Sequence, residues 1–254
     1  MPAQRLVYKA ARHAALVPAI LPDRGPSSVL IRTLKSGISR GTESLVFAGQ
    51  IPESEWVRMA CPHQVGVFSF PVSYGYSLVG QVLACGRNVT SLAKDDLVFV
   101  LHPHQDYVVV EENMARKLPA GLDAGRAVLA ANMETALNAY WDSGMKEGER
   151  AMVIGAGTVG LLSAYLIQKK TRCPVSVIDI NPNKRRIVEA LGLRFFLPDE
   201  AKEQSHPVPV IFHTSASQSG LLSALSLAAF EGRIIEMSWY GDKTVTLPLG
   251  HAFH

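Results

Sequence analysis

The sequence predicts an α/β protein with two domains, an antiparallel β-barrel and a parallel sheet with helices on its faces. Three observations support this prediction. Short β-rich segments without a long helical period fill the chain up to about Lys117. From Asp123 onward, strand and helix patterns alternate, which is typical of a parallel sheet. A glycine-rich turn joins the first strand of this second series to the helix that follows it.

The composition is that of a globular protein whose core is large enough to fold without metals or disulfides. The chain has 254 residues, of which 48% are hydrophobic and 19% charged. Its net charge of +3 does not favour nucleic acid or an anionic membrane as a partner. The cysteines Cys61, Cys85 and Cys173 lie far apart, which suits a reducing compartment, and no segment has the pattern of a signal peptide or a membrane span. We therefore expect a cytoplasmic protein.

The first domain, residues 1–122, is predicted to consist mainly of strands. Runs of β-branched and aliphatic residues alternate with turn residues such as those from Pro22 to Pro26. The segment Pro52 to Phe70 has weak patterning and is predicted to form a short helix followed by a loop. The predicted strands are 3–9, 14–18, 28–34, 76–84, 97–100 and 107–110.

The second domain, residues 123–254, is predicted to begin with a helix over 124–142, because apolar residues recur there at helical spacing. The predicted strands that follow are 151–154, 175–179, 194–197, 208–213 and 233–237, and the predicted helices are 158–169, 182–191 and 217–229. A doubly wound sheet of this kind has six strands, whereas five are predicted here. We therefore expect this domain to be incomplete beyond the segment Leu247 to His254.

The turn after the strand 151–154 has the spacing of a dinucleotide-binding site. Gly155 permits a tight turn, Gly157 lets the backbone approach a pyrophosphate, and Gly160 allows close helix–strand packing. Thr158 and Val159 begin the next helix, where unpaired backbone amides and the helix dipole favour phosphate. Because strand, glycines and helix all stand in the required order, we expect a bound dinucleotide rather than a turn without a ligand.

Asp179 bears on which cofactor binds. It ends the next predicted strand, where a carboxylate accepts hydrogen bonds from the ribose hydroxyls and repels a 2′-phosphate. NAD(H) is therefore favoured. The nearby Lys184, Arg185 and Arg186 would suit the extra phosphate of NADP(H), but a solvated basic helix face is the more economical interpretation of this cluster.

Several further segments carry a resemblance to a known family. They are Gly37 to Glu43 (GISRGTE), Tyr74 to Gly80 (YGYSLVG), Thr135 to Ala139 (TALNA), Val153 to Gly160 and Asp179 to Pro182. Over essentially the whole chain, the sequence resembles the medium-chain dehydrogenase/reductase superfamily, in particular its zinc-type alcohol dehydrogenase-like branch; a bacteriochlorophyllide dehydrogenase-like branch shares a related segment. The resemblance implies a GroES-like substrate domain, a Rossmann dinucleotide-binding domain, and a homodimer if the C-terminal segment is present. It also implies that Thr135, Ser215 and Ser238 line the cofactor.

The sequence departs from the family at the zinc ligands. The usual ligand positions hold Ser39 (or Arg40), Tyr76 and Ala131, which do not make a Lewis-acid site. We therefore expect no catalytic zinc. A metal site built instead from loop residues is the less favoured alternative; its candidate ligands are Cys61, His63, His102 and His104.

Hydride transfer without zinc requires another group to hold or deliver the proton. Tyr76 stands at a former ligand position, and its phenol could donate to a carbonyl oxygen, although a space-filling core role is equally compatible. Thr42, Ser39 and His104 are the other candidate catalytic residues.

The sequence therefore predicts a zinc-independent oxidoreductase that transfers a hydride between NAD(H) and a small alcohol or carbonyl substrate. One alternative is a degenerate member that binds the nucleotide without catalysis. The other is a metal-dependent dehydrogenase with a non-standard site. The residues do not identify the substrate.

Overall fold

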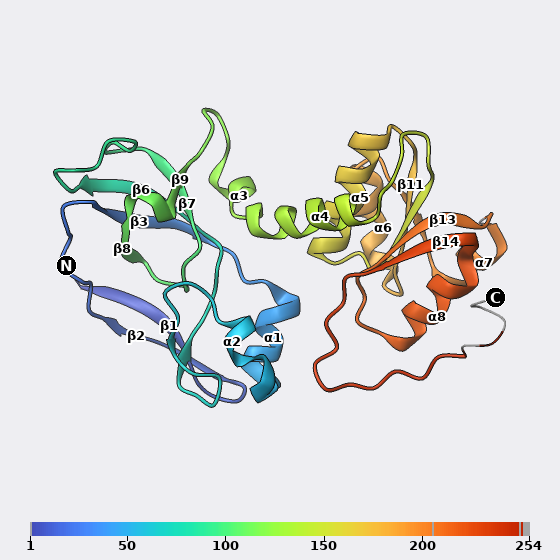
Figure 1. Ribbon diagram of the computed structural model, residues 1–254, viewed down its shortest axis with the longest axis horizontal. Helices are drawn as coiled ribbons and strands as arrows, with labels where there is room; N and C mark the ends of the chain where they lie inside the picture. Colours follow the sequence, from blue (N-terminus) through green and yellow to red (C-terminus); the bar gives the residue numbers. More distant parts are fainter. Residues whose placement is uncertain (1, 205, 249, 251–254) are drawn as a thin grey trace. The chain divides into compact units, whose positions relative to one another are not determined.

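The computed structural model describes residues 2–204, 206–248 and 250, which form two compact units, Met1–Ala131 and Asn132–His254. Figure 1 shows the first unit in blue to green and the second in yellow-green to red. The sequence placed the domain boundary between residues 122 and 123, just before the helices that lead into the second unit. Residues His251 to His254, part of the segment expected to end an incomplete domain, lie outside the described residues.

The first unit consists of two antiparallel sheets with the strand orders β2-β1-β5-β4 and β8-β3-β6-β7-β9 (Figure 1). A bridge between Arg5 and Gln105 links β1 to the segment before β8. The strands are β1 (Ala3–Ala10), β2 (His13–Ala19), β3 (Ser28–Ser36), β4 (Val65–Gly66), β5 (Val72–Ser73), β6 (Leu78–Cys85), β7 (Leu97–Val100), β8 (Tyr107–Glu111) and β9 (Ala115–Lys117).

Buried and more exposed side chains alternate along these strands, and the buried ones form the core of the first unit. Val29 and Ile31 of β3 are fully buried and pack with Val98 and Val100 of β7 in one cluster. Successive side chains of a strand point to opposite faces, so every second residue enters this core. The predicted β-rich architecture is confirmed.

One helix of the first unit was not predicted. α1 (Arg40–Ala48) begins at Ser39 and ends at Gly49, which adopts the left-handed conformation at φ +69°. Its first turn contains Gly41 and Thr42, which are poor helix formers, so local propensity gives little signal. The carboxylate of Glu43 accepts the Ser39 amide and thereby satisfies one of the donors left unpaired at the start of the helix.

The other helical elements of this unit are short. They are η1 (Glu53–Glu55), α2 (Trp56–Met59), η2 (Glu112–Met114) and α3 (Ala124–Ala127). The helix predicted over 124–142 is split, since α3 is separated from α4 (Ala130–Asp142) by Val128 and Leu129.

The second unit is built on one parallel sheet with the strand order β12-β11-β10-β13-β14. This is the order of a doubly wound dinucleotide-binding fold over its first five strands. Its elements after α4 are β10 (Ala151–Ile154), α5 (Thr158–Thr171), β11 (Val175–Ile178), η3 (Pro182–Lys184), α6 (Arg185–Ala190), β12 (Arg194–Phe196), α7 (Pro198–Gln204), β13 (Val208–His213), α8 (Gln218–Leu227) and β14 (Ala228–Glu236).

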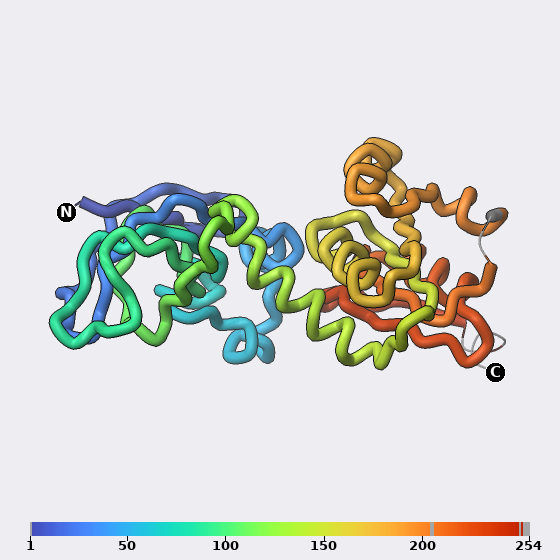
Figure 2. Tube along the Cα trace, turned by 90° about the horizontal axis from the view of Figure 1, so that it is seen from above, coloured from blue at the N-terminus to red at the C-terminus, as the bar shows by residue number. Residues whose placement is uncertain are grey.

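Helices cover both faces of this sheet (Figure 1 and Figure 2). Val153 of β10 packs with Ile167 of α5 and Val188 of α6 in one cluster. Its neighbour Met152 points to the other face, where it joins Ala224 of α8. Each strand therefore contributes to two cores, as expected for a parallel sheet. Within the described residues, no helix is both long enough and apolar enough to span a bilayer.

Candidate functional site

The glycine turn follows β10 at the carboxyl edge of the parallel sheet. Gly155 has φ +110°, which L side chains rarely adopt. A Cβ atom at Gly160 would lie 2.0 Å from the carbonyl oxygen of Gly155, so α5 packs directly against the turn. A Cβ atom at Gly157 would meet nothing within 4 Å, which leaves open space in front of this backbone. The turn therefore has the bend, the close packing and the accessible backbone that a pyrophosphate site requires.

Asp179 ties the end of β11 to this turn. Its Oδ2 atom accepts the Ala156 amide at 2.7 Å, and its Oδ1 atom accepts the Asn181 amide at 2.8 Å. Thr214, which directly follows β13, donates its hydroxyl to the Gly155 carbonyl at 3.0 Å. A carboxylate has about four acceptor sites, so Asp179 keeps capacity to accept ribose hydroxyls.

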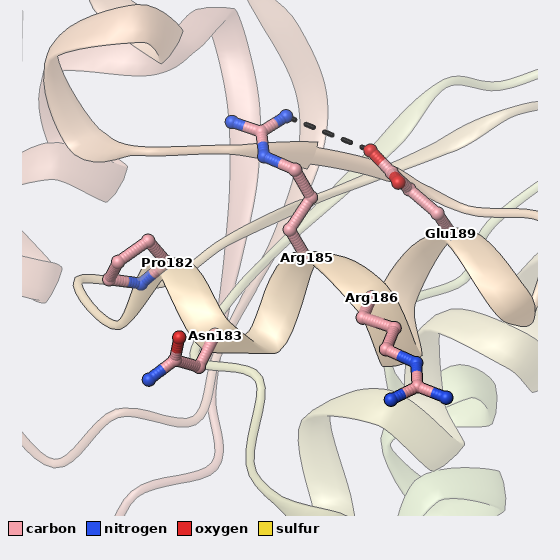
Figure 3. Close-up of a pocket in the computed structure, with 5 residues that line it drawn as sticks. All are labelled: Pro182, Asn183, Arg185, Arg186 and Glu189. Carbon is pink, nitrogen blue, oxygen red and sulfur yellow. Dashed lines mark ion pairs between the residues drawn. The ribbon is translucent and has the colours of Figure 1, made fainter.

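The basic residues after Asp179 have different surroundings. Arg185 donates to both carboxylate oxygens of Glu200, at 3.2 and 3.0 Å, and its Nη1 atom lies 3.7 Å from Glu189. In Figure 3, Arg185 extends toward Glu189, whereas the exposed Arg186 points away from this pair. The surface pocket shown there is lined by Pro182, Asn183, Arg185, Arg186 and Glu189. Arg185 is therefore paired with two acidic side chains at the surface.

The remaining predicted cofactor residues lie in the second unit as well. Thr158 and Val159 form the first turn of α5, and Lys184 ends η3. Ser215 follows β13, and its backbone nitrogen lies 3.1 Å from the position of a Cβ atom on Gly155. Ser238 follows β14 and accepts the Ala216 amide at 2.9 Å. Thr135 lies in α4.

A histidine–glutamate pair that was not predicted from the sequence lies at the same edge. His213 ends β13 and is 0% exposed, and its Nδ1 atom is 2.7 Å from Oε2 of Glu236, its register partner on β14. The Nε2 atom of His213 is 2.6 Å from the hydroxyl of Ser215, which in turn lies 2.8 Å from the hydroxyl of Ser217. The sequence carried only a partial signal: His213 ends one predicted strand and Glu236 is the second-last residue of the next, but their pairing depends on strand register.

Glu236 is anchored on both carboxylate oxygens. Its Oε1 atom accepts the Ser238 amide at 2.8 Å, and the Tyr240 hydroxyl lies 3.3 Å from Oε2. Burial raises the pKa of Glu236, but hydrogen bonds from His213 and Ser238 outweigh it, and the pKa is lowered overall. Burial, together with the neighbouring Glu236 carboxylate, raises the pKa of Tyr240 to about 12. Glu236 is therefore an ionised acceptor for the imidazole at neutral pH.

In the first unit, Glu43 is the centre of a buried hydrogen-bond network and is only 1% exposed. Its Oε2 atom lies 2.7 Å from Nε2 of His104 and accepts the Tyr8 hydroxyl at 3.1 Å, while Oε1 accepts the Ser39 amide at 2.8 Å. The Nδ1 atom of His104 is 2.5 Å from the hydroxyl of Ser36, which is exposed. Burial, followed by the charge of Glu43, raises the pKa of Tyr8. The network joins a buried carboxylate to the surface through one imidazole.

Tyr76 adjoins this network through the backbone. A Cβ atom on Gly75 would lie 2.9 Å from Nε2 of His104, so only glycine fits between the imidazole and the chain at this point. The Tyr76 ring is half-buried and meets Tyr74 edge-on, with ring centroids 6.0 Å apart. Thr42 is half-buried in α1, next to Glu43. Ser39 and His104 therefore meet at Glu43, a residue that was not among the predicted site residues.

The loop residues considered as alternative metal ligands do not converge on one point. The rings of His63 and His102 stack with centroids 4.9 Å apart, and Nδ1 of His102 lies 2.9 Å from the Pro103 carbonyl. Cys61 is buried, and that burial raises the pKa of its thiol to about 11. Among the residues that the structure describes, no three His, Cys, Asp or Glu side chains are close enough to hold a metal ion.

Comparison with known proteins places these features in a family context, although no family profile matches the sequence. D-guloside 3-dehydrogenase from Escherichia coli is 28% identical over 275 aligned positions, which cover 99% of this chain and 78% of that protein. A zinc-type alcohol dehydrogenase-like protein from Haemophilus influenzae is 25% identical, with coverages of 88% and 72%. (R,R)-butanediol dehydrogenase from Bacillus subtilis is also 25% identical, but the match covers 67% of this chain and only 56% of that enzyme.

Solved structures agree with the fold. The crystal structure of 2R,3R-butanediol dehydrogenase from Bacillus subtilis superposes with a TM-score of 0.79 at 19% identity, covering 99% of this chain and 82% of that one. CAD from Helicobacter pylori, complexed with NADP(H), superposes with a TM-score of 0.80 at 15% identity, covering 100% and 80%. The chain is thus similar over most of its length to zinc-type alcohol dehydrogenase-like proteins, and it has the fold of the dehydrogenase structures.

Proposed function

We propose that the protein is an oxidoreductase that transfers a hydride between NAD(H) and a hydroxyl or carbonyl group of a small molecule. The glycine turn provides the main support, because the backbone at Gly157 faces open space and Asp179 is fixed beside it. The names of the relatives, which include butanediol, D-guloside and L-threonine dehydrogenases, support a small hydroxyl-bearing substrate.

The preference for NAD(H) over NADP(H) follows from charge. The Asp179 carboxylate would lie close to a 2′-phosphate and repel it, while it would accept hydrogen bonds from unmodified ribose hydroxyls. Arg185, the basic residue with two acidic partners, is already paired with Glu200 and Glu189. NADP(H) remains the alternative that Arg186 and Lys184 would serve.

A bound nicotinamide supplies or accepts the hydride, and the residues of the chain have to position the substrate and move one proton. The usual zinc-ligand positions hold Ser39, Tyr76 and Ala131, whose side chains cannot polarise a carbonyl as a metal would. We assign the proton donor for reduction to the Tyr76 phenol. Thr42 and Ser39 would orient the substrate oxygen by hydrogen bonds.

His104 would connect the buried Glu43, which lies next to Thr42 in α1, to solvent. The path runs from the exposed Ser36 hydroxyl through the imidazole to Glu43, with contacts of 2.5 and 2.7 Å. An imidazole that contacts a partner through each nitrogen can accept a proton on one side and release one on the other. Such a path would carry a proton between solvent and the buried Glu43 carboxylate.

The test is a titration of the protein and of two Asp179 variants with NADH and NADPH. Asp179→Ala removes the ribose acceptor and is expected to weaken NADH binding roughly tenfold or more, with a smaller effect on NADPH. Asp179→Asn keeps one acceptor oxygen, enough for the Ala156 amide of the turn but not also for the Asn181 amide, and it loses the charge. It should therefore narrow the preference for NADH over NADPH. Equal losses for both nucleotides would overturn the NAD assignment, and no binding of either would overturn the proposed function.

A further inference from the structure

Three side chains of the second unit have the geometry of a nucleophilic triad. The Ser215 hydroxyl lies 2.6 Å from Nε2 of His213, and Nδ1 of the same imidazole lies 2.7 Å from Glu236. With the proton on Nδ1, the imidazole donates to the carboxylate and accepts the serine hydroxyl through Nε2. These are the three roles of nucleophile, base and orienting acid. We propose that Ser215 is an activated nucleophile and that the second unit carries an acyl-transfer activity toward small activated esters.

The local backbone presents Ser215 in a suitable way. The residue lies on the turn between β13 and α8, at the carboxyl edge of a parallel sheet, and is exposed. The next residue, Ala216, has φ +50°, so the chain bends sharply there. A serine on a tight strand-to-helix turn is the arrangement that exposes a nucleophile above the sheet in α/β hydrolases.

Gly220 makes room for the triad. A Cβ atom at this position of α8 would lie 2.2 Å from the Ser215 hydroxyl oxygen and 2.6 Å from Nε2 of His213. Any larger residue would separate the serine from its base. The base is itself fixed, because His213 is 0% exposed and Glu236 is held by the Ser238 amide at 2.8 Å.

The reaction balances with water as the second substrate. The Ser215 oxygen bonds to the carbonyl carbon of the ester, its proton passes to Nε2 of His213, and the imidazolium returns that proton to the departing alcohol as the ester bond breaks. Water then attacks the acyl-serine by the same route, which releases the acid and restores the hydroxyl. The oxyanion would be stabilised by amides in the first turn of α8, where the helix leaves backbone donors unpaired.

The experiment uses the full chain and a fluorophosphonate probe, in which the serine oxygen displaces fluoride from phosphorus. Intact mass and peptide mapping are expected to show one label, on Ser215. Ser215→Ala should abolish labelling, and His213→Asn should slow it by roughly 100-fold or more. Glu236→Gln should also slow it. Ser226→Ala, which removes an exposed hydroxyl of α8 that donates to the Ser223 carbonyl, is the matched control and should label at the unaltered rate.

His213 is buried, so its variant is compared only after circular dichroism shows native structure. Ser215 is exposed, so Ser215→Ala provides a second test that does not risk disturbing the packing of the core. The proposal is overturned if Ser215 takes up no label, or if a folded His213→Asn variant labels as fast as the unaltered protein. No cofactor is needed for labelling, so this result is separate from that of the NADH titration.

Discussion

His63 and His102 show how burial of single residues couples the stability of the first unit to pH. His102 is 7% exposed and stacks on His63. Burial lowers the pKa of His102 to about 4 from an ordinary 6.5. The hydrogen bond with the Pro103 carbonyl opposes part of this lowering, and the neighbouring His63 adds a smaller lowering. Burial also lowers the pKa of His63. Both imidazoles are therefore neutral in the folded protein at pH 7.

The sign of the pH effect follows from linkage. The unfolded chain takes up the His102 proton near pH 6.5, whereas the folded chain does so only near pH 4. The contribution of neutral His102 to the unfolding free energy is therefore fully present above about pH 6.5. It is lost as the pH falls toward 4, and the loss amounts to up to ~3 kcal/mol.

Urea unfolding followed between pH 7.5 and 4.5 tests this contribution. His102→Gln is expected to reduce the loss of unfolding free energy in that interval, since it removes the group whose protonation is penalised. His13→Gln, at an exposed position of β2, is the control and should keep the slope of the unaltered protein. Equal slopes for both variants would contradict the assignment.

At the scale of elements, Gly160 and Gly157 of the turn have different surroundings. Substitutions at these two positions can therefore distinguish an effect on folding from an effect on cofactor binding. A Cβ atom on Gly160 would lie 2.0 Å from the Gly155 carbonyl oxygen and 2.6 Å from the Thr214 hydroxyl, so this glycine is closed in on both sides. A Cβ atom on Gly157 would meet no other atom within 4 Å, and the φ of −76° at this residue suits alanine.

Alanine at each position should therefore have opposite effects. Gly160→Ala forces α5 away from the turn and is expected to lower the unfolding free energy by ~1–3 kcal/mol. Gly157→Ala should leave the melting temperature almost unchanged but weaken NADH binding roughly tenfold or more, because the methyl group occupies the space for the pyrophosphate. Calorimetric melting and NADH titration of both variants measure these effects. Unaltered NADH affinity in Gly157→Ala would show that the pyrophosphate does not lie against this turn.

The elements that the sequence predicted best are those with strong local patterns. The strands β10 and β13 begin and end where they were predicted, because each is a buried apolar run bounded by turn residues. α1 was missed because its stability depends on contacts of Glu43 with Tyr8 and His104, 35 and 61 residues away. α7 was also missed, although Pro198 at its start and the acidic residues Asp199 and Glu200 in its first turn are helix-start signals.

The candidate sites also divide into residues that a local sequence pattern identifies and residues that depend on contacts between distant segments. The residues proposed to bind the cofactor, Gly155 to Gly160 and Asp179, form a local motif with fixed spacing, so the sequence alone is enough to propose them. His213 and Glu236 become neighbours only through the parallel pairing of β13 with β14. Side-chain contacts across a sheet depend on register, which strand patterns alone do not specify.

At the scale of the whole molecule, each unit has a core of its own. Ile31 belongs to the cluster between the strands of the first unit, whereas Val153 and Phe212 belong to a cluster of the parallel sheet. A region with its own buried core can unfold as a separate cooperative unit. We therefore expect the two units to lose structure in separate steps.

Hydrogen exchange of the full chain tests that separation with one substitution in each core. Ile31→Ala leaves a cavity where a fully buried side chain stood and is expected to cost ~2–5 kcal/mol. The loss should appear as faster exchange of amides in β3 and β6, while amides in β10 and β13 keep their protection. Phe212→Ala is the reciprocal variant. It should accelerate exchange of the amides in β10 and β13 but not of those in β3. If either substitution accelerated exchange equally in both units, the chain would unfold as one cooperative unit, because a local cavity would then lower the stability of both cores together.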